Sequence, residues 1–356
     1  MTGAGARTIH LCQGLAVGGL ERIVIDLARC ARAAGHDDRI CCFDQSAIDP
    51  LRDFDPADVP VCFEPRRRGL DPSAVRRLAR VLGRARPAVL HAHNSTAAVY
   101  GAAARAMVPT RIRPALVVTF HNWPVRASPR ARWLTAFAAR RARSVVAVSR
   151  ELADRLSAGG WSSPIGVVAN GVVVRRFAPR PRTRSRDQLV VGMAARLVPG
   201  KRHDLLFAAV GRARAEGAEL TVSLAGDGPA RERVDPGLNE IGGSRRARVR
   251  DMPAWWSDLD IAALLSDHEG APIAALEALA AGLPLVASAV GGLPELVASH
   301  DAAMLVPNDE RAIASALLHL GDPGRRHELG ARARRCAVER HAIERCAAAY
   351  TALYAL

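Results

Sequence analysis

Short apolar segments and longer amphipathic segments alternate along the chain. Segments rich in β-branched residues are typical of buried strands, and they occur at 7–13, 39–43, 88–93, 115–120 and 144–149. Between the first two, residues 20–35 carry an apolar residue at every fourth position and end in Gly35, which predicts a helix with a glycine stop. Strands that alternate with helices predict a parallel sheet covered on both faces.

The alternation stops once, at residues 175–187. This stretch is rich in Pro and Arg and has no periodicity, which is typical of a linker. The alternation then resumes, with apolar segments at 188–195, 220–225, 260–266 and 284–289. We therefore expect two α/β domains in series, residues 1–180 and 181–356. The tail, residues 326–356, is helical, and its last helix is a candidate to pack back on the first domain.

The composition suits this organisation. A chain of 356 residues, 49% of them hydrophobic, is long enough for two domains with cores of their own. It contains no apolar stretch of membrane-spanning length and no signal-peptide pattern in residues 1–8, so we expect a cytoplasmic protein. The seven cysteines lack metal-ligand and CxxC spacing and are interpreted as small buried side chains in a reducing compartment.

The net charge lies entirely in the first domain. Residues 1–180 hold 28 Arg and 13 acids, which gives 28 − 13 = +15, whereas residues 181–356 hold 22 basic and 22 acidic groups. Within the first domain, residues 66–150 have 18 Arg and one acid, Asp71. A surface of one sign attracts polyanions or an anionic membrane.

Two kinds of partner fit this charge. The Arg-rich helices expected near 74–86 and 126–143 could rest on the inner membrane face, as in a peripheral membrane protein, or bind an acidic or lipid-linked molecule. A nucleic-acid-binding protein is the alternative from another class. Few aromatic residues interleave the basic ones and no nucleic-acid motif is present, so we expect no specific nucleic-acid partner.

Two glutamates follow the apolar segment 260–266. In parallel sheets, ligands bind where strands lead into helices, and with two such sheets we expect the site in the cleft between them. Glu269 falls in the loop and Glu277 in the following helix. Carboxylates accept hydrogen bonds from sugar hydroxyls, and the N–H groups at the helix start suit a phosphate. The simpler alternative is that both acids are merely solvated.

Basic and glycine residues follow the neighbouring segments. Arg196 and Lys201 leave the segment 188–195, and Lys201 is the only lysine among the 50 basic residues. The planar guanidinium of an arginine, which donates several hydrogen bonds, and the compact ammonium group of a lysine are both suited to binding a diphosphate. The segment 220–225 leads into A-G-D-G-P, where Gly226 would let a flat ring lie against the backbone.

These motifs together resemble the family-4 retaining glycosyltransferases of the GT-B fold. In chain order they are G-G-L-E-R (18–22), A-N-G-V-V-V-R-R-F-A-P (169–179), A-R-L-V-P-G-K (195–201), A-G-D-G-P (225–229), the E-x7-E of Glu269 and Glu277, and A-S-A-V-G-G-L-P-E (287–295). The resemblance implies two Rossmann-like, doubly wound domains facing across a cleft. It also implies sugar transfer with retained configuration from a nucleotide diphosphate sugar, UDP- or GDP-linked, to an acceptor hydroxyl. Cell-envelope, exopolysaccharide and glycolipid synthesis are the pathways it suggests.

The resemblance also implies roles for single residues of a donor site. Glu277 would bind the ribose hydroxyls of the nucleotide. Glu269, counted among the catalytic residues, would bind the donor sugar's hydroxyls together with the backbone of Gly270 and Ala271. The donor would bind in residues 181–356 and the acceptor in residues 1–180, with no bound cofactor.

Further roles concern the leaving group and the reacting carbon. Arg196 and Lys201 would hold the diphosphate and stabilise it as it leaves. Gly18 and Gly19 would bring the first domain's backbone close to the phosphate. His121, which follows the segment 115–120, would lie near the donor sugar. The alternative for His121 is a histidine hydrogen-bonded to a neighbouring carbonyl.

A metal site is not expected. His91 and His93 point to one face of a strand, but no third ligand accompanies them at a helpful spacing. The resemblance implies that the Arg and Lys take over the electrostatic role of a metal. A double displacement would require a carboxylate nucleophile, and the first domain's strand ends carry His, Asn, Gly and Ser instead.

Other functions remain as alternatives. The segment 248–253 looks about five residues shorter than is usual beside the nucleobase in this family, which keeps open a nucleotide-sugar-binding protein with weakened catalysis. A sugar-nucleotide epimerase shares the fold logic. A phosphorylase would need a lysine for pyridoxal phosphate, and Lys201 is already assigned to the diphosphate. The turn at 14–19 lacks the G-x-G-x-x-G spacing of an NAD enzyme.

Overall fold

The chain folds into two compact units. The computed structural model describes residues 7–15, 18–44, 58–67, 69–123, 128–161, 164–179 and 188–355. One unit is formed by residues 1–171 with 343–356, and the other by residues 172–342. The residues from 172 to the boundary expected at 180 therefore belong to the second unit and not to the first. The last helix belongs to the first unit, although it follows the second unit in the sequence. Most of the expected linker, 180–187, lies outside the described residues.

The first unit is built on a parallel sheet of seven strands in the order β3-β2-β1-β4-β5-β6-β7. The strands are β1 (Arg7–Cys12), β2 (Asp37–Cys42), β3 (Val61–Phe63), β4 (Val89–Ala92), β5 (Ala115–Phe120), β6 (Ser144–Ala147) and β7 (Ile165–Val167). Its helices are α1 (Gly19–Ala33), α2 (Pro72–Ala85), α3 (Ser95–Ala106), α4 (Pro129–Ala139), α5 (Arg150–Ala158) and α13 (Ile343–Ala355).

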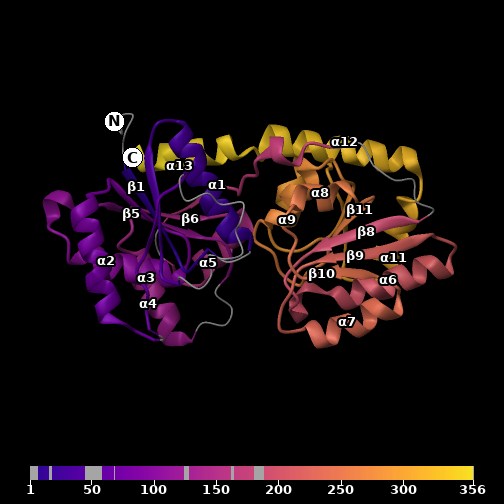
Figure 1. Cartoon of the computed structure of the whole chain (residues 1–356), viewed down its shortest axis with the longest axis horizontal. Helices are drawn as coiled ribbons and strands as arrows, with labels where there is room; N and C mark the ends of the chain where they lie inside the picture. Colours follow the sequence, from indigo (N-terminus) through magenta and orange to yellow (C-terminus); the bar gives the residue numbers. More distant parts are fainter. Residues whose placement is uncertain are drawn as a thin grey trace. The chain divides into compact units, whose positions relative to one another are not determined.

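Helices cover both faces of this sheet. The C-terminal helix α13 packs on α1, while α2, α3 and α4 pack side by side on the other face (Figure 1). The single acid of the Arg-rich stretch, Asp71, is structural, because its carboxylate accepts hydrogen bonds from the backbone N–H groups of Ser73 and Ala74 at the start of α2. Because Asp71 is the only acid in residues 66–150, the positive charge of the arginines in this stretch is not balanced by carboxylates of the same stretch.

The second unit repeats the architecture with six parallel strands, in the order β10-β9-β8-β11-β12-β13. The strands are β8 (Leu189–Ala194), β9 (Leu220–Ala225), β10 (Ser244–Arg246), β11 (Ile261–Leu264), β12 (Leu285–Ser288) and β13 (Met304–Val306). The helices are α6 (His203–Ala215), α7 (Arg231–Glu240), α8 (Met252–Ser257), α9 (Ile273–Ala280), α10 (Leu293–Val297), α11 (Glu310–His319) and α12 (Pro323–Arg340).

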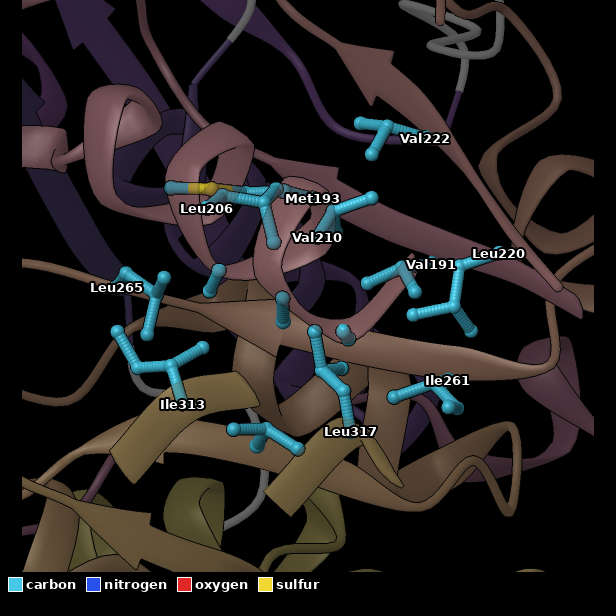
Figure 2. Packing of buried hydrophobic residues seen from close by; sticks show 14 of the residues in the cluster. Val191, Met193, Leu206, Val210, Leu220, Val222, Ile261, Leu265, Ile313 and Leu317 are labelled. Carbon is cyan, nitrogen blue, oxygen red and sulfur yellow. The ribbon is translucent and has the colours of Figure 1, made fainter. Parts of the chain in front are cut away.

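The core of the second unit lies between its sheet and the helices α6, α7 and α11. Val191 and Ile261 on the strands meet Leu206 and Val210 of α6 and Leu317 of α11, all of them fully buried (Figure 2). On the opposite face, α9 packs against α8 and α12. This packing on both faces fixes the strand ends that carry the motifs.

Candidate functional site

In the second unit, the order in which the chain adds strands to the parallel sheet reverses between β8 and β11. These two strands are neighbours, but the chain runs from β8 to β9 on one side and from β11 to β12 on the other. Such a switch point separates the loops at the carboxyl ends of the two strands, which makes it the usual ligand site of a doubly wound sheet. Lys201 follows β8 and Glu269 follows β11, so both expected residues lie at the switch point.

Lys201 and Glu269 form an ion pair with each other. The Nζ of Lys201 donates to Oε1 of Glu269, and Ser266 Oγ donates to the same oxygen at 2.8 Å. The Glu269 side chain is 6% exposed and that of Lys201 26%. The two loops are also joined by the Asp267 N–H, which donates to the Gly200 carbonyl at 3.0 Å. Since both bonds reach Oε1, the other oxygen of Glu269 is the one that a ligand hydroxyl would meet.

The backbone at Glu269 is held by the glycine turn that follows β12. The Gly292 N–H donates to the Glu269 carbonyl at 3.0 Å. Gly291 has a φ of +57°, and a Cβ there would lie 1.9 Å from the same carbonyl oxygen. A glycine is therefore required at 291 for both its backbone conformation and its close approach.

Glu277 lies within α9 and is oriented by a tryptophan from α8. The Trp256 Nε1–H donates to Glu277 Oε2 at 3.0 Å, and both residues are buried. Sequence reasoning missed Trp256 and Ser266 as partners of the two glutamates. The pair of tryptophans at 255–256, directly after the shortened segment, was the available signal for the first of them.

The remaining residues expected in this unit lie on loops around the same strand ends. Arg196 is exposed on the loop after β8, and Gly270 and Ala271 are buried just before α9. Gly226 follows β9 with a φ of +146°, and a Cβ there would lie 2.0 Å from the Ala195 carbonyl oxygen. This glycine is thus required by the contact between two loops of the protein itself, a reason that the sequence analysis did not foresee.

In the first unit, Gly18 and Gly19 lie where the chain enters α1. Gly18 is the N-cap of this helix, with an extended backbone, and its carbonyl accepts from the Arg22 N–H at 3.1 Å. A Cβ at Gly18 would have the carboxyl group of Glu21 as its nearest neighbour, and that group can move. Packing within the unit therefore does not by itself require a glycine at 18.

His121 lies directly after β5, at the end of a chain of buried histidines. Its Nε2 lies 3.4 Å from His93 Nδ1, and His93 Nε2 lies 2.9 Å from His10 Nδ1. His10 Nε2 lies 2.9 Å from Asp38 Oδ2. Burial lowers the pKa of His121 to about 4, against the hydrogen bond with Asn170, which raises it. His121 is therefore neutral at physiological pH.

The sequence analysis was wrong to find no third ligand near His91 and His93. His10 of β1 lies beside them, and one ring nitrogen from each lies within 4.8 Å of the others. His91, however, bonds to Tyr354 through Nδ1 and to Thr119 through Nε2, both at 2.7 Å. Burial also lowers the pKa of His91 and His93 well below the usual value. The ring nitrogens of these histidines are thus already hydrogen-bonded within the protein.

Two family models match the chain in succession. The model described as Glycosyltransferase Family 4 matches residues 17–176, and the model described as Glycosyl transferases group 1 matches residues 188–322. The chain belongs to the family-4, group 1 glycosyltransferases. The matches cover the strand ends of both units, where the motifs of this glycosyltransferase chain lie.

Individual relatives agree with this assignment. A GDP-mannose-dependent α-(1-6)-phosphatidylinositol monomannoside mannosyltransferase of Mycolicibacterium smegmatis is 32% identical over 219 residues, which are 55% of this chain and 57% of the relative. The putative colanic acid biosynthesis glycosyltransferase WcaL of Escherichia coli is 30% identical over 169 residues, 43% of this chain and 41% of the relative. The chain thus spans about half the length of the curated relatives it matches.

A solved structure matches over the whole length. The structure of Anabaena Alr3699/HepE in complex with UDP and glucose has a TM-score of 0.83 and 22% identity, and the match covers 99% of this chain and 100% of that one. The expected GT-B fold, with two doubly wound parallel-sheet domains, is confirmed. Among the described residues, none of the helices combines the length and apolar character needed to cross a membrane.

Proposed function

We propose that this protein is a glycosyltransferase that moves a sugar from a nucleoside diphosphate sugar to an acceptor hydroxyl with retention of configuration. The observation that carries the proposal is the Lys201–Glu269 ion pair at the switch point of the second unit, with Glu277 on the helix that follows. It combines a cation for phosphate with carboxylates for hydroxyl groups at the end of a parallel sheet. Membership of the family supports the same reaction class.

The donor is assigned to residues of the second unit. Glu277, one of whose oxygens is held by Trp256, accepts the ribose hydroxyls. Glu269 accepts hydroxyls of the sugar, and Gly270 and Ala271 supply backbone contacts at the start of α9, where N–H groups favour an anion. The GDP-mannose dependence of one relative and the UDP complex of the structural neighbour support a GDP- or UDP-linked sugar.

Catalysis is assigned to charge stabilisation of the leaving diphosphate. Negative charge grows on the phosphate oxygens as the glycosidic bond breaks, and fixed cations stabilise that charge most strongly where water is partly excluded. Lys201, a quarter exposed, and Arg196 are the cations assigned to this role. No metal ion is required in this scheme.

The first unit is assigned the acceptor and two contributions to the reaction. Gly18 and Gly19 would allow a phosphate to approach the start of α1, and the lack of a packing reason for glycine at 18 supports this role. His121 would contact the donor sugar. The acceptor proton passes to the departing phosphate on the same face of the sugar, because the residues that directly follow β4, β5 and β6 include His, Asn and Ser and no carboxylate nucleophile.

A transfer assay with defined donors tests this proposal. The protein is incubated with UDP-glucose or GDP-mannose and with phosphatidylinositol mannoside or polysaccharide fragments, and products are identified by mass spectrometry and by anomeric proton coupling. We expect an α-linked product from an α-linked donor, lost in Glu269→Gln and retained in the exposed control Glu240→Gln. A β-linked product, or a trapped covalent glycosyl-enzyme adduct, would contradict the mechanism.

Membrane contact is proposed for α4 of the basic first unit. Trp133 and Phe137 are 62% and 41% exposed and stack with ring centroids 5.4 Å apart. The guanidinium of Arg141 lies 3.5 Å from the Phe137 ring centroid. Exposed aromatic side chains beside arginines are typical of helices that rest in the interface of an anionic membrane, where a lipid-linked acceptor would be found.

Vesicle co-sedimentation tests this contact. Phosphatidylglycerol vesicles should retain the protein better than phosphatidylcholine vesicles, and added salt should weaken the retention because charges at the surface are screened. Replacing both Trp133 and Phe137 by Ala should lower the bound fraction several-fold, whereas Val338→Ala, an exposed apolar residue of the second unit, should leave it unchanged. Equal binding to both kinds of vesicle would contradict the proposal.

A further inference from the structure

A hydrogen-bonded chain of four side chains runs across the sheet of the first unit and ends at His121. Asp38 lies on β2 and His10 on β1, while His93 follows β4 and His121 follows β5. These strands are consecutive in the sheet, in the order β2-β1-β4-β5. All four side chains are buried, with exposures of 2%, 1%, 0% and 8%. The three contacts measure 2.9, 2.9 and 3.4 Å from Asp38 to His121.

The carboxylate and the number of protons on His10 together set the direction of the bonds in this chain. An ionised carboxylate can only accept, so His10 donates its Nε2–H to Asp38. With a single proton on His10, its Nδ1 accepts and His93 donates to it through Nε2–H, whereas a second proton on His10 would reverse this bond. By the same argument, His93 Nδ1 accepts from the Nε2–H of His121.

We propose that Asp38, His10 and His93 are positioning residues that hold His121 in the tautomer with its proton on Nε2, so that Nδ1 accepts a hydrogen bond from a substrate hydroxyl. The Nδ1 atom is buried and has no hydrogen-bond partner among the described residues, which is the state expected of an acceptor kept for a ligand. The ligand class follows from the tautomer. A bare imidazole nitrogen attracts an O–H group and repels a phosphate oxygen.

His121 has one further contact, a hydrogen bond with the side chain of Asn170 that raises its pKa, as expected where the amide oxygen accepts from a ring N–H. The His91 ring lies against His10 and His93, with centroids 5.4 and 3.9 Å away, but its nitrogens bond to Tyr354 and Thr119. Tyr350 of α13 bonds to Thr119 at 3.1 Å.

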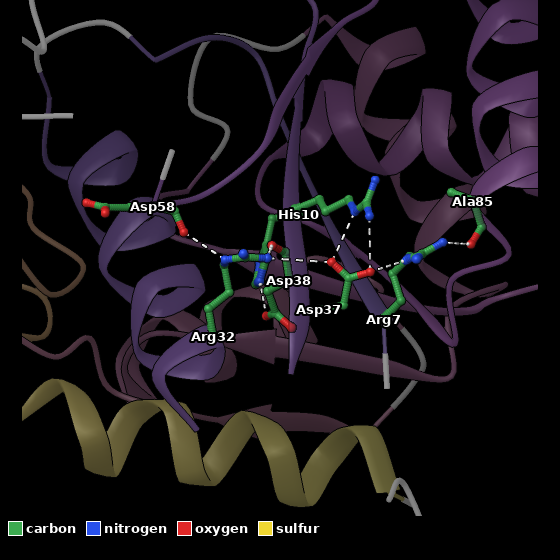
Figure 3. A network of polar contacts seen from close by, with 8 residues as sticks. Arg7, His10, Arg32, Asp37, Asp38, Asp58 and Ala85 are labelled. Carbon is green, nitrogen blue, oxygen red and sulfur yellow. Dashed lines mark hydrogen bonds and ion pairs between the residues drawn. The ribbon is translucent and has the colours of Figure 1, made fainter. Parts of the chain in front are cut away.

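On the β2 side, Arg32 donates to the Asp38 backbone carbonyl at 3.5 Å. Arg32 also pairs with the carboxylate of Asp37, and Asp37 in turn pairs with Arg7 and Arg39. Figure 3 shows His10 and Asp38 beside this separate network of arginines. The side chain of Asp38 is thus directed to His10, and its neighbour Asp37 is directed to the arginines.

The role of Nδ1 in substrate binding rests on the proposed function, whereas the tautomer itself does not. If the hydroxyl belongs to the donor sugar or the acceptor, an incorrect tautomer would place an N–H against it and lower the specificity constant. It would not alter nucleotide binding, which is assigned to Glu277 in the second unit. Two readouts, one without any substrate and one with it, therefore separate the two claims.

The first experiment is nitrogen-15 NMR of the full chain with labelled histidine, with His121 assigned by comparison with His121→Gln. At pH 7.5 we expect a protonated Nε2 and an unprotonated Nδ1 on His121. A protonated Nδ1 would mean that the chain runs in the opposite direction, with two protons on His10, and would overturn the proposal. A stoichiometric metal ion in the purified protein, bound by His10, His91 and His93, would overturn it as well.

The second experiment replaces Asp38 by Asn, which offers an N–H to His10 and favours the reversed chain. A carboxylate that sets a histidine tautomer contributes large factors to turnover, so kcat/KM should fall about tenfold or more, with unchanged nucleotide affinity. Asp37→Asn, the adjacent carboxylate on the arginine side, is the matched control. Equal kcat/KM for the two variants, both shown to be folded by their melting curves, would overturn the proposal. A wild type without transferase activity would refute the proposed function and leave the NMR result to decide the tautomer.

Discussion

At the residue scale, the acids proposed for the donor site stand out in the sequence, whereas their hydrogen-bond partners do not. Three charged residues stand out in apolar, alanine-rich segments, where a charge is unusual unless it has a partner or a ligand: Glu269, Glu277 and Lys201. Trp256 and Ser266 have no such contrast, since a buried tryptophan or serine is ordinary. That each donates to a glutamate depends on how α8 and the loop after β11 pack, which no sequence spacing specifies.

Replacing Trp256 by Phe tests whether the Glu277 carboxylate needs its N–H partner. The ring is largely kept, but Glu277 Oε2 loses the bond at 3.0 Å, so one of the contacts that orient the carboxylate for the ribose is removed. We expect nucleotide affinity, measured by calorimetry, to fall about tenfold, or ~1.4 kcal/mol. Trp255→Phe is the matched control, because Trp255 donates to Ser223 at 3.1 Å instead. Equal losses of affinity in both variants would argue against this role for Trp256.

Acid should destabilise the protein through its buried histidines. Burial lowers the pKa of His121 from 6.5 to about 4. Between these two values the unfolded chain binds more protons than the folded one, so the free energy of unfolding rises with pH up to about 6.5 and is then level for this group. The contribution of His121 is about 3 kcal/mol, fully present above pH 6.5 and lost as the pH falls toward 4.

Urea unfolding at a series of pH values measures this slope. His121→Gln removes the titrating group, so its free energy of unfolding should vary less steeply than that of the wild type between pH 4 and 6.5. His91, His93 and His203, whose pKa values are also lowered by burial, contribute to the slope that remains. Parallel pH profiles for variant and wild type would show that His121 is not held neutral by burial.

At the element scale, the sequence predicted the central strands and missed the edges. The nine apolar segments all contain strands, and each of these nine strands has a neighbouring strand on both sides. The missed strands, β3, β7, β10 and β13, are the edge strands of the two sheets and have three residues each. An edge strand is buried less and pairs on one side only, so it needs no long apolar segment.

The glycine turn after β12 is the element that fixes Glu269, and Gly291→Ala tests it. A Cβ would lie 1.9 Å from the Glu269 carbonyl oxygen, at a φ of +57°. We expect a loss of roughly 2–4 kcal/mol in unfolding free energy, together with loss of donor binding. Gly211→Ala in α6 is the control, because nothing lies within 4 Å of its Cβ position, and it should gain about 0.5–1 kcal/mol. A Gly291→Ala variant as stable and as active as the wild type would contradict the geometry of this turn.

At the scale of the whole molecule, the two-sheet organisation could be predicted from the alternation of segments, whereas contacts between distant parts of the chain could not. The histidine chain joins positions 10, 38, 93 and 121. Beside it, Tyr354 of α13 bonds to His91, whose ring lies against His10 and His93. Spacing along the sequence shows only His91 and His93 as neighbours. Strand order brings the others together, and that order follows from how the helices pack, not from a local pattern.

The whole-molecule claim is that this chain binds a nucleoside diphosphate sugar through its second unit. The most direct test is the thermal stability of the wild type and of Glu277→Gln with UDP, GDP, ADP, CDP and dTDP, each with and without an attached sugar. At about 100 times its dissociation constant, the correct ligand should add roughly 2.7 kcal/mol of stability to the wild type. The account predicts that a UDP or GDP ligand stabilises the wild type and not Glu277→Gln, while Glu240→Gln responds like the wild type. Stabilisation by none of these ligands, or equal stabilisation of Glu277→Gln, would contradict it.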